Sequence, residues 1–111
     1  MLAWLDGGGR ADATYERGKF SGLTLLMGAA HYGHKRLVEL LLQRGADANL
    51  QNSDGWTALM RAARNGHERA VDPLLRHGAE VDKKNRNGGT ALTYSAQEGY
   101  ERVVDLLLRR E

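Results

Sequence analysis

The chain of 111 residues contains no cysteine, so it can form neither a disulfide nor a cysteine-ligated metal site, and a reducing compartment is favoured. Its single proline excludes a proline-rich linker. No apolar stretch approaches the roughly 20 residues that a membrane-spanning helix needs. Residues 1–6 lack the basic region of a secretory signal. We therefore expect an intracellular protein, cytoplasmic or nuclear, that makes no contact with a membrane.

The charge is close to balanced. Sixteen basic and fourteen acidic residues give a net charge of +2, and they are interspersed as on an ordinary solvated surface. Nucleic-acid binding is not expected, because the basic residues do not form a stripe with interleaved aromatic residues. The length predicts one domain, and the fourteen glycines indicate many tight turns.

What the chain does contain is a pattern that recurs every 33 residues. A fixed period of this size indicates one supersecondary unit copied in tandem, with each copy burying its apolar face against its neighbours. The recurring sets are Gly22, Gly55 and Gly88; Thr24, Thr57 and Thr90; Gly33, Gly66 and Gly99; and Leu41-Leu42, Leu74-Leu75 and Leu107-Leu108.

The middle unit, 52–84, shows how one copy is built. After an Asp-Gly turn, Thr57 can cap a short helix over 58–64, which an Asn-Gly pair ends. A second, longer helix runs from about 67 to 76. Units of this shape are wedges, and stacked wedges curve with the short helices on the inner side. The apolar stripe of the second helix consists of Val71, Leu74 and Leu75.

This pattern resembles the ankyrin repeat, whose period is also 33 residues. The resemblance covers residues 19–111 and implies an all-α solenoid of helix-turn-helix units joined by β-hairpin-like loops. The matching runs are Thr24-Leu25-Leu26-Met27, Thr57-Ala58-Leu59-Met60 and Thr90-Ala91-Leu92-Thr93; Gly33-His34 and Gly66-His67; and Gly45-Ala46-Asp47-Ala48-Asn49 and Gly78-Ala79-Glu80-Val81-Asp82.

We expect residues 1–111 to form a single ankyrin-repeat domain. Within it, residues 1–18 form a degenerate N-terminal cap or half repeat, 19–51 repeat 1, 52–84 repeat 2 and 85–111 a truncated repeat 3. No following repeat covers the last apolar stripe, so we expect a monomer that could associate through its uncapped C-terminal repeat. That stripe consists of Val104, Leu107 and Leu108.

Leu25, Ala58 and Ala91 stand where the family has proline, and two further departures bear on stability. Met27, Met60 and Thr93 stand where the family has histidine, so the hydrogen bonds of that histidine are absent. Pro73 falls inside the second helix of the middle repeat, where it removes a hydrogen bond at a cost of roughly 3 kcal/mol. We expect a kink or a local loosening there.

No residue pattern predicts catalysis, a cofactor or a metal. His31 and His34 are three residues apart, but no carboxylate set is placed to complete a metal site. His34 and His67 occupy the same position of successive repeats, which favours a structural role at the start of the second helix. Residues 7–9 are glycine-rich but lack the Gly-Lys-Ser/Thr ending of a phosphate-binding loop.

The positions at which the repeats disagree are free to serve recognition. The resemblance implies that a partner is held by the hairpin tips and by the exposed side of the short helices. The candidate partner-binding residues are Phe20, Leu23, His31, Tyr32, Ser53, Asp54, Trp56, Arg64, Asn65, Lys84, Arg86, Asn87, Gln97 and Glu98.

Trp56 is the strongest single candidate, because tryptophan is enriched in interface hot spots. The alternative is that Trp56 simply packs over the neighbouring hairpin. The basic run 83–86, with Arg64 nearby, indicates a partner carrying acidic groups; the alternative is a solvated hairpin.

The function we expect is non-catalytic protein–protein recognition on a concave face, with no cofactor. Two alternatives remain: a structural segment of a longer array that binds nothing itself, and an engineered or truncated ankyrin chain.

Overall fold

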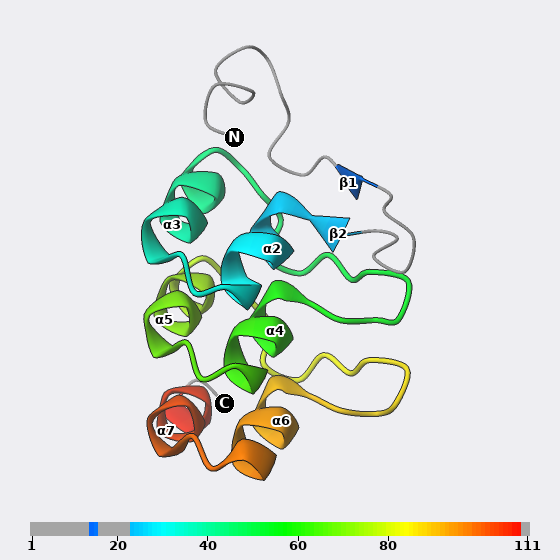
Figure 1. Cartoon of the computed structure of the whole chain (residues 1–111), viewed down its shortest axis with the longest axis vertical. Helices are drawn as coiled ribbons and strands as arrows, with labels where there is room; N and C mark the ends of the chain where they lie inside the picture. Colours follow the sequence, from blue (N-terminus) through cyan, green and yellow to red (C-terminus); the bar gives the residue numbers. More distant parts are fainter. Residues whose placement is uncertain (1–13, 16–22, 110–111) are drawn as a thin grey trace.

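The computed structural model describes residues 14–15 and 23–109. Within this part, six helices form three antiparallel pairs that stack in chain order, as Figure 1 shows. The shorter, inner helix of each pair lies in one column and the longer, outer helix lies in the other. The predicted all-α solenoid is confirmed. The pairs are α2 (Leu25–His31) with α3 (Lys35–Gln43), α4 (Ala58–Arg64) with α5 (Glu68–Arg76), and α6 (Ala91–Glu98) with α7 (Glu101–Arg109).

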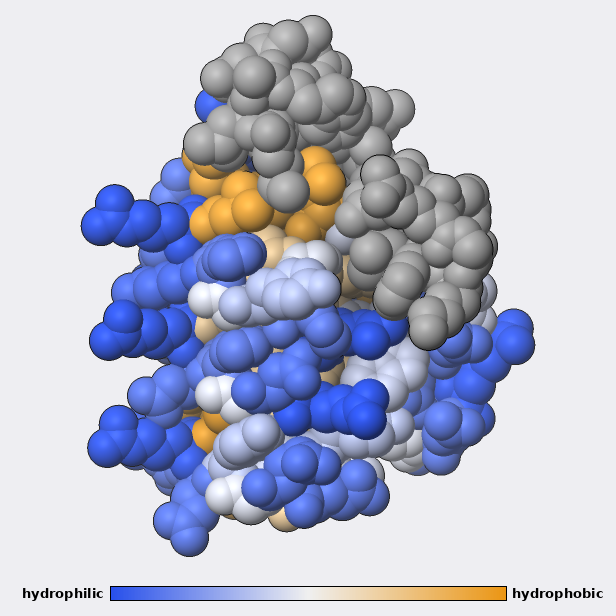
Figure 2. Space-filling model, viewed as in Figure 1, coloured by the Kyte–Doolittle hydropathy of each residue, from blue (hydrophilic) through white to orange (hydrophobic). Residues whose placement is uncertain are grey.

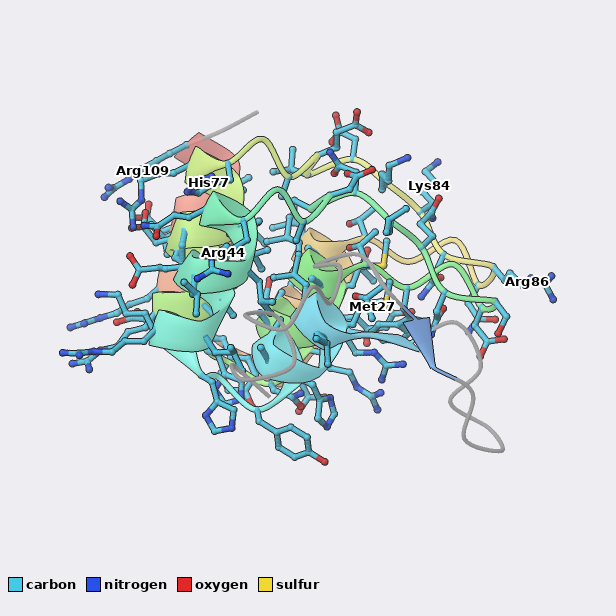
Figure 3. The ribbon with its side chains drawn as sticks, turned by 90° about the horizontal axis from the view of Figure 1, so that it is seen from above. Met27, Arg44, His77, Lys84, Arg86 and Arg109 are labelled. Atoms are coloured by element: carbon cyan, nitrogen blue, oxygen red, sulfur yellow. The ribbon has the colours of Figure 1, made fainter. Side chains whose placement is uncertain are left out.

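The loops between the pairs project on one side of the stack. In the view of Figure 2, most of the described surface is hydrophilic. Seen from above in Figure 3, Lys84 and Arg86 on the loops lie on the opposite side from Arg44, His77 and Arg109 at the ends of the outer helices. The loops and the outer helices therefore present two separate surfaces.

The first hairpin is longer than the others. Its strands β1 (Thr14–Tyr15) and β2 (Leu23–Thr24) pair antiparallel, with Thr14 opposite Thr24. In the next hairpin, Asn52 N donates to Trp56 O at 2.9 Å, so fewer residues are enclosed. The first hairpin thus begins ahead of residue 19, the predicted start of repeat 1. Apart from Thr14 and Tyr15, the predicted cap over 1–18 lies outside the described residues.

Each inner helix begins at a threonine cap, as the sequence predicts. Thr24, Thr57 and Thr90 accept the backbone N–H three residues later at 3.1 to 3.2 Å. In the third repeat Thr93 stands at the family's histidine position, and its hydroxyl accepts the Thr90 N–H at 3.2 Å. This reciprocal capping box satisfies two amides that no residue inside the helix can bond. In the first two repeats the same position holds Met27 and Met60, and both side chains are buried in the core.

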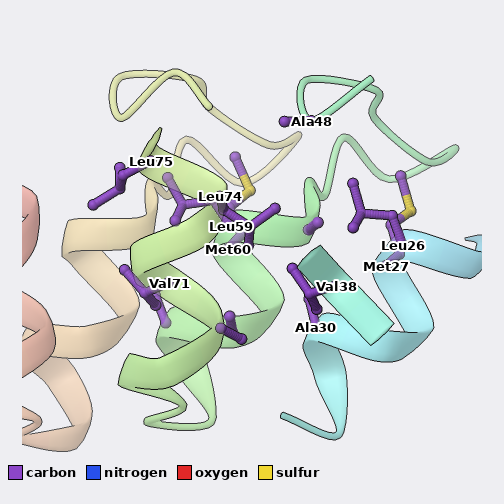
Figure 4. Close-up of a cluster of buried hydrophobic side chains, with 14 of the residues drawn as sticks. Leu26, Met27, Ala30, Val38, Ala48, Leu59, Met60, Val71, Leu74 and Leu75 are labelled. Carbon is purple, nitrogen blue, oxygen red and sulfur yellow. The ribbon is translucent and has the colours of Figure 1, made fainter. Parts of the chain in front are cut away.

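The core is one continuous layer between the two columns of helices (Figure 4). The alanine pairs of α2 and α4 are buried, which lets α3 and α5 pack closely against them. Burying apolar area contributes about 25 cal/mol per Å², so this layer supplies most of the stabilisation. Its largest fully buried side chains include Leu26, Leu41, Leu59, Leu74 and Leu107.

Glycines at the end of the inner helices make room for the next repeat. A Cβ on Gly33 would lie 2.6 Å from the His67 ring, and one on Gly66 would lie 2.8 Å from the Tyr100 ring. Both glycines also have positive φ, of 71° and 72°. In α5 and α7, the ring at the start of the outer helix therefore packs over the glycine of the preceding repeat, and for His67 this is the structural role that the sequence predicts.

Pro73 does not interrupt its helix. Helix α5 runs unbroken from Glu68 to Arg76 and has the same nine residues as α3 and α7. The proline therefore does not split the helix. Pro73 is fully buried, and its carbonyl accepts the His77 N–H at 3.0 Å. Helix α5 packs against α3, α4 and α7, and one missing hydrogen bond does not divide it.

The apolar faces are covered in the first two repeats and open in the third. Leu42 and Leu75 are 7% and 5% exposed, whereas the equivalent Leu108 is 52% exposed. Val104 is half-buried at a position where Val71 is fully buried. Of the predicted final stripe, only Leu107 is fully buried, because its position faces the inner helix of its own repeat.

We predict that Pro73→Leu stabilises the protein by about 1–3 kcal/mol, since it restores a helix hydrogen bond and matches Leu40 and Leu106 at the equivalent positions. Urea denaturation measures the change. The matched control is Leu40→Pro, which should destabilise by a similar or larger amount. An unchanged or lower midpoint for Pro73→Leu would show that the packing already absorbs the proline.

We predict that Leu75→Ala lowers the free energy of unfolding by about 2–4 kcal/mol, because it leaves a cavity between two repeats. The equivalent Leu108→Ala should cost less than about 1 kcal/mol, because half of its side chain already meets solvent. Equal losses in thermal or urea unfolding would contradict the view that each repeat is stabilised by the next.

Candidate functional site

The described candidate residues fall into two rows along the stack. One row is the C-terminal ends of the inner helices, and the other is the hairpin tips; together we call them the inner surface. The helix-end residues are His31, Tyr32, Arg64, Asn65, Gln97 and Glu98, and the hairpin residues are Ser53, Asp54, Trp56, Lys84, Arg86 and Asn87. Phe20 lies outside the described residues, and Leu23 lies in β2.

Trp56 is the centre of a stacked cluster. Its ring lies 4.6 Å from the Tyr94 ring of the next repeat at an interplanar angle of 24°. The guanidinium carbons of Arg61 and Arg64 lie 4.8 and 5.6 Å from the Trp56 ring centroid. Such cation–π contacts contribute roughly 0.5–2 kcal/mol each and hold the guanidinium groups in place. Trp56 therefore does pack over its neighbour, and it also positions two arginines.

Tyr94 links this cluster to the hairpin of its own repeat. Its hydroxyl accepts from Asn85 Nδ2 at 2.6 Å, and its ring occupies the space in which a Cβ on Gly89 would lie. Gly89 stands where the preceding repeat has Trp56. The absence of a side chain at Gly89 thus allows Tyr94 to face the preceding repeat.

A second network surrounds His31 at the end of α2. Asn65 Nδ2 donates to His31 O at 3.1 Å and lies 3.1 Å from His31 Nδ1. His67 Nε2 donates to the same carbonyl at 3.0 Å. An amide donor facing Nδ1 requires that nitrogen to be unprotonated, which matches a neutral ring. Tyr32, 70% exposed, packs edge-on against His31 at 4.7 Å.

Where the two networks meet, around His31 and Arg61, the neighbouring charged groups are mostly basic. Burial, followed by the charges of Arg61, His67 and Arg64, lowers the pKa of His31 from its ordinary value of 6.5. Burial, followed by the charge of Arg64, likewise lowers the pKa of Arg61. The carboxylate of Asp54 acts in the opposite direction and raises this pKa. The Arg61 Nε atom is buried and has no hydrogen-bond partner in the described part of the chain.

The hairpin tips are braced against one another. Arg86 N donates to Asp54 O at 3.0 Å, and Gln51 Nε2 donates to Lys84 O at 3.0 Å. A Cβ on Gly55 would lie 2.9 Å from the Asn85 Cα, so the two loops approach as closely as glycine permits. Lys84, Arg86 and Asn87 are exposed on this rigid support.

The structure connects only some of the predicted residues. The Arg64 guanidinium lies over the Trp56 ring, and its charge lowers the pKa of His31. The Asn65 side-chain amide donates to the His31 carbonyl. No hydrogen bond, ion pair or ring contact between described residues joins Gln97 or Glu98 to another candidate. The prediction missed Arg61 and Tyr94, which occupy the same position of successive repeats. That position reads Gly28, Arg61 and Tyr94, so the disagreement between repeats was visible in the sequence.

Among residues 14–15 and 23–109, no group of three or more histidine and acidic side chains is placed to hold a metal ion. None of the helices in this part is long and apolar enough to cross a membrane.

We predict that stability falls as the pH drops below about 6.5, because the unfolded chain protonates His31 at a higher pH than the folded chain does. Between the two pKa values the unfolded state binds more protons, so acidification favours it. Urea midpoints from pH 7.5 to 5.5 measure the slope, and His31→Gln should make it shallower. An identical slope in the variant would contradict the assignment.

Comparison with known protein families agrees with the repeat pattern and the fold. The sequence model of ankyrin repeats, in three copies, matches residues 11–111. No curated protein matches the chain. Ankyrin repeats are in general non-enzymatic protein–protein interaction modules. With a match over nine-tenths of its length and three stacked helix pairs, the chain belongs to the ankyrin-repeat family.

Proposed function

We propose that this protein is a non-catalytic recognition module that binds another protein on its inner surface, the predicted concave face. The observation that carries the proposal is the Trp56 cluster. It combines a tryptophan, a tyrosine and two arginines, the residue types that contribute most at protein interfaces, on one rigid support.

The position of the cluster supports the proposal. Trp56 and Arg64 belong to the middle repeat, and repeats flank them on both sides, so a partner that spans the stack passes over them. Ser53, Asp54, Arg86 and Asn87 extend the same surface along the hairpin tips. The packing of Trp56 limits the side-chain entropy that binding would cost.

The chemistry of the surface does not suit catalysis. A nucleophile needs a base within hydrogen-bond reach and a third group that orients the base. The His31 ring faces the amide of Asn65 and two arginines, and among the described residues no serine or threonine hydroxyl is bonded to it.

The experiment begins with proteins captured by the immobilised chain, from which a partner is identified and purified for titration calorimetry. We predict that Trp56→Ala weakens this partner at least about thirtyfold, equivalent to a hot-spot loss of about 2 kcal/mol. Arg64→Glu should also weaken it markedly. Circular dichroism and urea melts verify that both variants fold, because Trp56 also packs on Tyr94.

Arg69→Glu is the matched control. Arg69 is an exposed arginine like Arg64, but it lies on the outer helix α5. Its reversal should have little effect on the partner. Equal losses of affinity from Arg64→Glu and Arg69→Glu would mean that the partner binds through non-specific electrostatic attraction or through the outer helices. The proposal would then fail.

A further inference from the structure

Four cationic or protonatable groups converge at the junction of the first two repeats. His31 ends α2, Arg61 and Arg64 lie on α4, and His67 precedes α5. Hydrogen bonds fix His31 to His67 and to Asn65, and the Trp56 ring fixes both arginines. The group is therefore held in place by contacts, and its members cannot simply move apart.

This junction has few negative charges. The groups that act on His31 are Arg61, His67 and Arg64, all basic, and the one carboxylate that acts on Arg61 is Asp54. On the outer helices, by contrast, described basic side chains form ion pairs, such as Arg76 with Asp72 at 3.2 Å and Arg109 with Asp105 at 2.7 Å. The inner cluster is thus set apart by unbalanced charge.

Arg61 has hydrogen-bonding capacity that the described chain does not use. Its Nε atom is buried without a partner among these residues, and leaving a buried polar group unpaired is unfavourable. A guanidinium lying on an aromatic ring keeps its edge available, and this edge matches the two oxygens of a carboxylate or phosphate. An incoming oxyanion at this edge would reduce the repulsion between Arg61 and Arg64.

We infer that Arg61, Arg64 and the neighbouring His31 form a receptor for one oxyanion on an acidic segment of the partner protein, either a glutamate or aspartate carboxylate or a phosphorylated side chain. The inference rests on the proposed function and specifies its ligand. It places the acidic recognition at the junction of α2 and α4, whereas the sequence indicated the basic run at residues 83–86. A peptide is favoured over nucleic acid because the charge is one focus and not a stripe.

Three blocked peptides of identical length test this: one with two adjacent glutamates in a glycine-serine context, one with a phosphoserine at the same place, and one with two glutamines. Each is titrated into the full ¹⁵N-labelled chain while the arginine Nε–H resonances are followed by NMR. We expect saturable shifts of the Arg61 and Arg64 signals with the glutamate or phosphoserine peptide and none with glutamine. The charged peptide that binds more tightly identifies the source of the oxyanion.

Arg64→Gln should weaken the tighter peptide roughly tenfold, as expected for one lost charge-assisted hydrogen bond. Arg61→Lys keeps the positive charge but loses the paired N–H donors of the guanidinium edge, so it should also weaken the peptide. Arg69→Gln on the outer helix is the matched control and should leave affinity unchanged. The inference is overturned if glutamine shifts the same signals, if Arg69→Gln weakens binding as much as Arg64→Gln, or if a short single-stranded oligonucleotide outcompetes both charged peptides.

The two proposals fail in distinguishable ways. If neither charged peptide shifts Arg61 or Arg64 while Trp56→Ala still weakens the captured partner, the inner surface binds protein but the oxyanion receptor is wrong. If the charged peptides bind as expected while the partner tolerates both Trp56→Ala and Arg64→Glu, the receptor stands and the proposed protein-binding surface is wrong.

Discussion

Every part of this structure depends on the burial of one repeat's apolar face against the next. A single helix pair exposes leucines on both sides of its wedge and cannot form a closed core. The equivalent leucines illustrate this, since Leu75 is covered by the following pair and Leu108 is not. His67 packs closely over Gly33, and this fit fixes the spacing between neighbouring helix pairs. The threonine cap, the turn glycine and the buried leucine of each repeat therefore recur at the same spacing. Among the described repeats, the middle one packs against a neighbour on both sides.

This constraint separates structural positions from positions available for recognition. The threonine caps and buried alanines cannot vary without loss of packing, whereas the position of Gly28, Arg61 and Tyr94 changes completely between repeats. The variation is coupled across the interface: Tyr94 can stack on Trp56 only because its own repeat has Gly89 where Trp56 would otherwise recur. The Trp56 cluster is therefore a property of two adjacent repeats, and neither repeat would form it alone.

The same distinction explains what the sequence could predict. The helix bounds 58–64, the threonine caps and the stripe of Val71, Leu74 and Leu75 follow from local periodicity and capping, and the structure confirms them. The unbroken helix at Pro73 was not predictable, because neighbouring helices outweigh one lost hydrogen bond. The roles of Arg61 and Tyr94 depend on which side chains meet across repeats, and a period in the sequence does not specify such contacts. The candidate residues as a set, including Gln97 and Glu98, remain predictions.

The arrangement around Arg61 opposes stability and thereby argues for recognition. Two arginines beside a histidine with a lowered pKa repel one another, and a buried Nε without a partner among the described residues adds a desolvation cost. Stacking on Trp56 offsets part of this cost, but a neutral side chain in place of Arg61 would avoid it altogether. Strain of this kind persists where the surrounding structure holds it, and a bound oxyanion would offset the repulsion between the two arginines. Because the free protein bears the repulsion that the ligand removes, binding an acidic group at this junction should also rigidify the contact between the first two repeats.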